Sequence, residues 1–119
     1  MTVEILGVRI DTVTKPEALY RVAQFLKGNE IKTIFTPNPE MIMAAQKDDY
    51  LKSILNQSAL NTCDGQGIAM LYKWREHKSL ERITGVDFMM DLCAYAEKEG
   101  LAIYLLGAGI ALEIKTAAE

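Results

Sequence analysis

Alternating apolar and polar positions open the chain and predict a pair of strands. Apolar residues at positions 3, 5, 8, 10 and 13 are interleaved with polar ones, and Gly7 supplies a turn between the two halves. A period of two is typical of a strand with one face buried and the other in water. The first 13 residues therefore predict a half-exposed β-hairpin.

A helical period replaces this alternation after Thr14. Thr14 and Glu17 match a capping box, Pro16 is tolerated in the first turn of a helix, and Gly28 stops the pattern. The apolar positions between them recur every three to four residues and predict a buried stripe: Leu19, Val22, Ala23, Phe25 and Leu26.

Two strands are then predicted, each ending in a turn that leads into a helix. Residues 31–36 are rich in β-branched and aromatic side chains and run into Pro37-Asn38-Pro39, with a helix expected at 40–46. Asp48 is placed to cap one more helix. Residues 59–63 predict the second strand, and the turn Asp64-Gly65-Gln66-Gly67 connects it to a further helix.

The last part of the chain repeats this order. A helix is predicted over 86–99, closed by Gly100, and the continuous apolar run 101–106 predicts a strand buried on both faces. Alternating strands and helices predict one α/β domain over 1–119, a Rossmann-like, mostly parallel sheet flanked by helices behind the hairpin. Because the helix expected from residue 110 has no stop signal, we expect the C-terminal part of a longer domain to be missing.

Composition excludes several classes of protein. A net charge of -3 argues against nucleic-acid binding, which normally shows a basic surplus. Cys63 and Cys93 match no metal-ligand spacing or disulfide framework, so a cytoplasmic location is expected. Neither a signal peptide nor a membrane span is predicted, since the longest apolar run, 101–112, is well short of roughly 20 residues. No Asp-x-Asp pair occurs, and no metal or cofactor is predicted.

Candidate chemistry lies in the three loops that follow predicted strands, because ligands bind at that edge of open α/β sheets. Two of these loops are glycine turns that feed helix N-termini, which suit a phosphate, although neither completes a dinucleotide fingerprint or a P-loop. The candidate binding residues are Thr36, Asn38, Gly65, Gly67, Gly107 and Ala108.

Asp64 and Arg82 are the candidate catalytic residues. An Asp-Gly pair is more commonly a turn or a helix cap, but a carboxylate at a strand end is also placed to take a proton from a sugar hydroxyl. Arg82 is either a solvated surface arginine or a clamp for a diphosphate leaving group. Asn38 satisfies either a ligand or its own turn.

Other residues have simpler interpretations. His77 is expected to be exposed, and Cys63 to be a buried strand-end residue rather than a nucleophile. The basic cluster of Lys73, Arg75 and Lys78 is either a solvated helix end or a contact for lipid phosphates. Most methionines are expected on core faces: Met41, Met43, Met70, Met89 and Met90.

Five sequence blocks, in order along essentially the whole chain, resemble one family, the WecG/TagA/CpsF glycosyltransferases. The blocks are ILGVRIDTVT, similar to the family's N-terminal hairpin; TPNPEMIMAAQKD, with its Thr-Pro-Asn signature; ALNTCDGQGIAM, the Asp-Gly-x-Gly block; ERITGVDFM, the Arg-x-x-Gly-x-Asp block; and IYLLGAG, a nucleotide-side glycine turn.

The resemblance implies an inverting, metal-independent transfer of N-acetylmannosamine from its uridine diphosphate donor (UDP-ManNAc) to the 4-hydroxyl of undecaprenyl-diphospho-GlcNAc. Asp64 would be the general base, Arg82 would stabilise the departing uridine diphosphate, and Thr36 and Asn38 would lie beside the sugar. It also implies peripheral association with the inner face of the membrane, a role in teichoic acid or surface polysaccharide synthesis, and a homo-oligomer. A nucleotide-binding module without catalysis and a structural interaction domain remain the alternatives.

Overall fold

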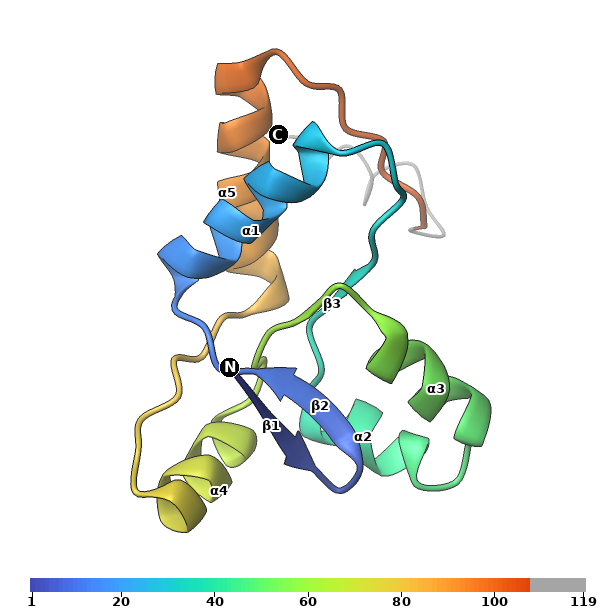
Figure 1. Ribbon diagram of the computed structural model, residues 1–119, viewed down its shortest axis with the longest axis vertical. Helices are drawn as coiled ribbons and strands as arrows, with labels where there is room; N and C mark the ends of the chain where they lie inside the picture. The colour runs from blue at the N-terminus through green and yellow to red at the C-terminus, as the bar shows by residue number, and fades with distance from the viewer. Residues whose placement is uncertain (108–119) are drawn as a thin grey trace.

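The computed structural model describes residues 1–107 (Figure 1). The helix expected from residue 110 and the candidate residue Ala108 lie outside this part of the chain.

The chain begins with the predicted hairpin. Strands β1 (Thr2–Ile5) and β2 (Val8–Asp11) pair antiparallel, with Val3 opposite Ile10. The two turn residues, Leu6 and Gly7, have φ angles of 49° and 81°. Positive φ at both central residues matches the natural twist of a two-residue hairpin.

A short parallel pair forms the centre of the fold. Strands β3 (Ile34–Phe35) and β4 (Leu60–Asn61) align Ile34 with Leu60. Hydrogen bonds from the Ala59 N–H to the Thr33 carbonyl and from the Asp64 N–H to the Pro37 carbonyl keep the two segments side by side beyond the strands. Both predicted strands are therefore present, but shorter than expected.

Helices occur where the apolar periodicity predicts them, and most of the predicted caps are confirmed. Thr14 and Glu17 form the capping box, Asp48 caps its helix through the Leu51 N–H, and Gly100 ends its helix at a φ of 68°. The five helices of the described residues are α1 (Lys15–Lys27), α2 (Pro39–Ala45), α3 (Asp49–Gln57), α4 (Gln66–Glu76) and α5 (Gly85–Glu99).

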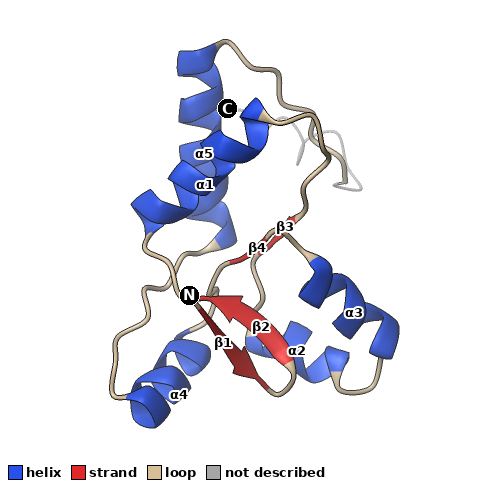
Figure 2. Ribbon diagram, viewed as in Figure 1, coloured by secondary structure: helices blue, strands red, loops and turns tan. Residues whose placement is uncertain are grey.

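The helices form two groups on either side of the parallel strands. Helices α1 and α5 pack together at one end of the molecule, while α2, α3 and α4 surround the hairpin at the other (Figure 1). Strands β3 and β4 lie between these groups (Figure 2). Leu60 packs in the core of α1 and α5, and Cys63, three residues later, packs in the core beneath the hairpin.

A buried carboxylate joins the hairpin to β4 and α1. Asp11, only 4% exposed, accepts a hydrogen bond from the Asn61 N–H at 2.8 Å and pairs with the Arg21 guanidinium at 3.0 Å. The Asn61 side chain also donates to the Arg9 carbonyl. Because a side-chain oxygen satisfies the β4 backbone, the hairpin is fixed beside β4 without a strand ladder between them.

The α/β class is confirmed, whereas the strand predicted at 101–106 is wrong. This segment has no regular secondary structure and pairs with no strand among residues 1–107, and Tyr104 and Leu106 are 85% and 89% exposed. The parallel sheet of the described residues therefore has two strands. A buried apolar strand needs a neighbouring ladder and cover on both faces, and neither is present within residues 1–107.

The expectation that the methionines fill the core is also wrong for most of them. Met41 packs against the core, but four others are largely exposed: Met43, Met70, Met89 and Met90. Within residues 1–107, every helix is too short or too polar to cross a bilayer.

Candidate active site

Three segments that are distant in sequence meet at the carboxyl end of β4. The carboxylate Oδ2 of Asp64 accepts a hydrogen bond from the Gly85 N–H at 3.1 Å. A Cβ built on Gly85 would lie 3.1 Å from the Thr36 hydroxyl oxygen and 3.6 Å from Asp64 Oδ2. Thr36, Asp64 and the start of α5 therefore converge at one edge, as ligand binding by an α/β domain requires.

Arg82 lies in the loop that reaches this edge. The Ile83 N–H donates to the Cys63 carbonyl at 2.8 Å, and the Glu81 carboxylate accepts from the Lys15 N–H at 2.9 Å. Both neighbours of Arg82 are thus held in place, while its own side chain is exposed. The arrangement presents a guanidinium to solvent one residue from the backbone contact with Cys63, just after β4.

The turn after Asp64 packs too closely for any side chain at residue 65. A Cβ on Gly65 would lie 2.8 Å from the Pro39 ring Cδ. Gly65 is also the N-cap of α4 and has no side chain to bond the first N–H groups of that helix. These N–H groups, with exposed Gly67 in the first turn, therefore have no side-chain partner from the cap residue, and a helix start of this kind favours an anion.

Asn38 has a structural role in the described chain. Its side-chain oxygen accepts a hydrogen bond from the Met41 N–H at 2.9 Å and caps α2. This is the turn-satisfying alternative expected from the sequence. A contact between Asn38 and a sugar stays a prediction, as does the binding role of half-buried Thr36.

The thiol beside Asp64 is not suited to nucleophilic chemistry. Cys63 is 1% exposed, and burial raises the pKa of its thiol above the ordinary value. The charge of Asp64 raises this pKa further, whereas the Arg82 guanidinium opposes the shift. The buried interpretation of Cys63 is confirmed, and His77 is exposed at the end of α4 as expected.

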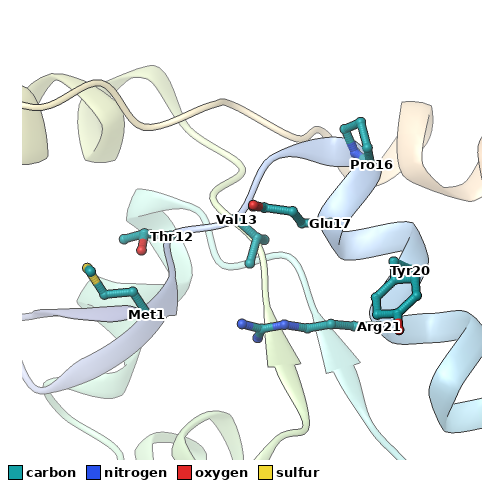
Figure 3. A pocket seen from close by; sticks show the side chains of 7 residues that line it. All are labelled: Met1, Thr12, Val13, Pro16, Glu17, Tyr20 and Arg21. Carbon is teal, nitrogen blue, oxygen red and sulfur yellow. The ribbon is translucent and has the colours of Figure 1, made fainter.

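Away from the candidate active site, a hollow of about 580 Å³ lies between the first residues of the chain and α1. Figure 3 shows Glu17 and Arg21 extending from α1 toward Val13. Both charged groups are already engaged, because Glu17 closes the capping box and Arg21 pairs with Asp11. None of the candidate site residues lines this hollow.

The remaining candidates contribute less to the described site. Gly107 has a φ of 118°, and a Cβ built there would meet no atom of residues 1–107 within 4 Å. The role of Gly107 in nucleotide binding stays a prediction. Within residues 1–107, His, Cys, Asp and Glu side chains form no group of three placed to hold a metal ion.

Sequence reasoning missed the contribution of Gly85. The available signal was Thr84, whose side chain accepts from the Asp87 N–H and starts α5 at Gly85, one residue before the helix start expected at Val86. A threonine followed three residues later by an acidic residue is a helix-start pattern. It places the Gly85 N–H at the first turn, where Asp64 meets it.

A comparison with known families identifies the family of the chain. The model of the Glycosyl transferase WecG/TagA/CpsF family matches residues 3–119, and the chain belongs to this family. Two relatives, from Staphylococcus aureus strains COL and NCTC 8325, are each named N-acetylglucosaminyldiphosphoundecaprenol N-acetyl-beta-D-mannosaminyltransferase. Each is 26% identical over 108 residues, which cover 89% of this chain and 42% of the relative. The chain thus spans less than half the length of these relatives.

Proposed function

We propose that the protein is an inverting glycosyltransferase that moves N-acetylmannosamine from UDP-ManNAc to the 4-hydroxyl of undecaprenyl-diphospho-GlcNAc. Family membership and the names of the relatives support the sugar and the lipid-linked acceptor. The observation that carries the proposal is the meeting of Thr36, Asp64 and the Arg82–Gly85 loop at one edge.

In this proposal Asp64 acts as the general base. Its carboxylate takes the proton of the acceptor hydroxyl while that oxygen attacks the anomeric carbon of the donor sugar. The new glycosidic bond forms as the bond from this carbon to the diphosphate breaks, and the diphosphate leaves with the electron pair. A single displacement with one base on the acceptor side inverts the anomeric centre, by analogy with inverting glycosidases.

Arg82 and the start of α4 are proposed to stabilise the leaving group. A guanidinium forms paired hydrogen bonds with phosphate oxygens, and the uncapped first turn of α4 offers further N–H donors. Together they would offset the negative charge that develops on the diphosphate without help from a metal ion. Thr36, with its hydroxyl near Asp64, is proposed to hydrogen-bond the sugar.

The acceptor places the proposed reaction at a membrane. A lipid diphosphate remains in the bilayer, so we propose that the protein works at the inner face of the cell membrane, in teichoic acid or surface polysaccharide synthesis. Self-association is proposed as well, because the exposed apolar segment 101–106 and the sheet edges left unpaired within residues 1–107 are surfaces that a second copy would cover.

A transfer assay combined with calorimetry tests the proposal. The intact protein is incubated with UDP-ManNAc and a lipid-diphosphate GlcNAc acceptor, and the product linkage is determined by NMR. We expect release of one UDP per disaccharide, a β-linked product from an α-linked donor, and saturable binding of UDP. Binding of UDP without transfer would favour a nucleotide-binding module, and the lack of both would favour a structural interaction domain.

A further inference from the structure

An apolar groove borders the candidate active site. It has a volume of about 170 Å³ and lies between the hairpin turn, α2 and α4, with Leu6, Met43 and Leu71 among its lining residues. Pro39 and Gly67 also line it. Because the Pro39 ring also packs against Gly65, the groove lies next to the Asp64-Gly65 turn.

Hydrogen bonds hold the hairpin turn in place beside the groove, and part of the apolar wall faces solvent. The Gln46 side chain donates to the Leu6 carbonyl, and Asn56 donates to the Gly7 carbonyl, so the hairpin turn is tied to the end of α2 and to α3. Leu6 and Met43 are nonetheless 58% and 57% exposed. Large apolar side chains held in water around a preformed groove mark a site for an apolar ligand.

The apolar surface continues along α4. Gly67, Leu71 and Trp74 follow one another at spacings of four and three residues, which places them on one face of the helix. Trp74 is 77% exposed. A path of exposed apolar side chains therefore leads from the first turn of α4, where a diphosphate would bind, along the groove and away from the catalytic edge.

Two basic side chains lie near this path, Lys52 of α3 and Arg75 of α4. The Lys52 ammonium lies 3.3 Å from the Cβ position of Gly7, and Arg75 donates to the Glu4 carbonyl. Residues 66–79 carry three basic and one acidic side chain, a formal charge of +2 in a protein of net charge -3. An apolar groove with basic side chains nearby complements a ligand that joins a hydrocarbon chain to an anionic head.

We propose that this groove binds the first isoprenoid units of the lipid-diphosphate acceptor, so that the protein recognises the hydrocarbon chain as well as the sugar. The inference rests on the proposed function, because it takes the acceptor to be a lipid diphosphate. The diphosphate lies near the start of α4, its sugar extends toward Asp64, and its chain leaves past Leu71 and between Leu6 and Met43. Because the groove lies beside the catalytic edge, binding of the chain in the groove then selects acceptors with a long apolar chain.

A binding experiment tests this without relying on transfer. Trp74 is the single tryptophan of the chain, so its fluorescence reports ligands that enter the neighbouring groove. The intact protein is titrated with geranylgeranyl diphosphate, with isopentenyl diphosphate, whose chain is one isoprenoid unit long, and with inorganic diphosphate. We expect a saturable change with the long chain, and binding weaker by about tenfold or more for the other two.

Matched variants locate the binding site. The groove variant combines Leu6→Asn, which keeps a residue tolerant of positive φ, with Met43→Gln and Leu71→Gln. The control variant carries Leu26→Gln, Met89→Gln and Met90→Gln, which remove comparably exposed apolar side chains from α1 and α5. The groove variant is expected to bind geranylgeranyl diphosphate about tenfold more weakly, and the control variant to match the unmodified protein.

Several results would overturn the inference. Equal affinity for inorganic and geranylgeranyl diphosphate would mean that only the head is recognised. Unchanged binding in the groove variant would place the chain elsewhere, and an altered oligomeric state in that variant would assign the groove to a second copy. Equal binding to phosphatidylglycerol vesicles with and without the prenyl diphosphate would indicate a general membrane contact. Failure of the proposed function is recognised separately, as absence of sugar transfer by the unmodified protein.

Discussion

The Asp64 carboxylate Oδ2 accepts a hydrogen bond from the Gly85 N–H at an N···O distance of 3.1 Å, and this bond joins the loop after β4 to the first turn of α5. The positive end of the helix dipole favours a negative charge at this position. One carboxylate oxygen is thereby fixed, and the Thr36 hydroxyl lies beside it across Gly85. The same hydrogen bond therefore orients the proposed base and connects the loop after β4 to α5.

Replacing Asp64 with Asn is expected to lower kcat by about 10² to 10⁴ while leaving the fold intact. The amide oxygen of Asn can still accept the Gly85 N–H, but the amide cannot take a proton from the acceptor. The measurement is kcat by UDP release, with circular dichroism as the check on folding. Asp48→Asn is the matched control, because Asp48 caps α3 away from this edge. Full turnover in the Asp64 variant would remove its role as base.

Replacing Arg82 with Ala is expected to lower kcat/KM by about 10²-fold and to weaken UDP binding. The reason is the loss of a guanidinium that would pair with the leaving diphosphate, and Arg82→Lys should restore only part of the activity. Steady-state kinetics and calorimetry provide the measurements. Lys27→Ala serves as the control, since Lys27 is an exposed cation in the last turn of α1, away from the catalytic edge. Unchanged kinetics would reduce Arg82 to a surface charge.

Gly65→Ala is expected to destabilise the fold by about 1–3 kcal/mol. The added Cβ would lie 2.8 Å from the Pro39 ring Cδ, and because this ring is part of the α2 backbone, relief of the clash requires a shift at the start of α2 or α4. Gly28→Ala provides the comparison, because its nearest atom would be a carbonyl oxygen at 3.5 Å and its φ is -87°. Urea titrations that give the free energy of unfolding of both variants are the measurement. Equal stability of the two variants would contradict the close packing.

Asp11→Ala is expected to cost about 2–4 kcal/mol of unfolding free energy, because it leaves the buried Asn61 N–H and the Arg21 guanidinium without their partner. The lower end of the range reflects Arg21, whose side chain is 35% exposed and gains partial hydration. Glu30→Ala, which removes the surface pair with Lys32, should have a smaller effect. Urea unfolding of both variants is the measurement, and similar losses would show that the Asp11 network is not central to the fold.

Cys63 is expected to react with iodoacetamide much more slowly than Cys93, which is half-buried. Burial raises the pKa of the Cys63 thiol above its ordinary value of 9.0, which applies to the unfolded chain. As the pH rises through 9.0, the thiol therefore loses its proton in the unfolded chain before it does so in the folded protein. The contribution of the protonated Cys63 thiol to the free energy of unfolding is complete below pH 9.0 and declines as the pH rises above this value.

The pH dependence provides a second test of the buried thiol. Between about pH 8 and pH 10 the unmodified protein should lose more unfolding free energy than Cys63→Ala, in which the titrating group is absent. Urea titrations at both pH values give this difference, and the titration of other groups cancels in the comparison. Equal losses, or equal labelling rates of the two cysteines, would show that the Cys63 thiol is accessible.

Local signals in the sequence determined the helices and their ends. The Thr14–Glu17 capping box, Asp48 as a cap and Gly100 as a stop all act within one turn of the backbone, so they are readable without the rest of the fold. The hairpin follows from alternation and Gly7 for the same reason. These features identified five of the elements and the loops in which Asp64 and Arg82 lie.

The tertiary structure alone decided which of these loops meet and which apolar residues are covered. The Asp64–Gly85 bond, the approach of Pro39 to Gly65 and the groove beside Leu6 and Leu71 all join segments far apart in the chain. The run 101–106 and the exposed methionines show the same limit, because hydrophobicity identifies surface that favours burial but does not supply the partner that buries it. That partner is set by how the helices pack around the hairpin and the two short parallel strands, which no local pattern encodes.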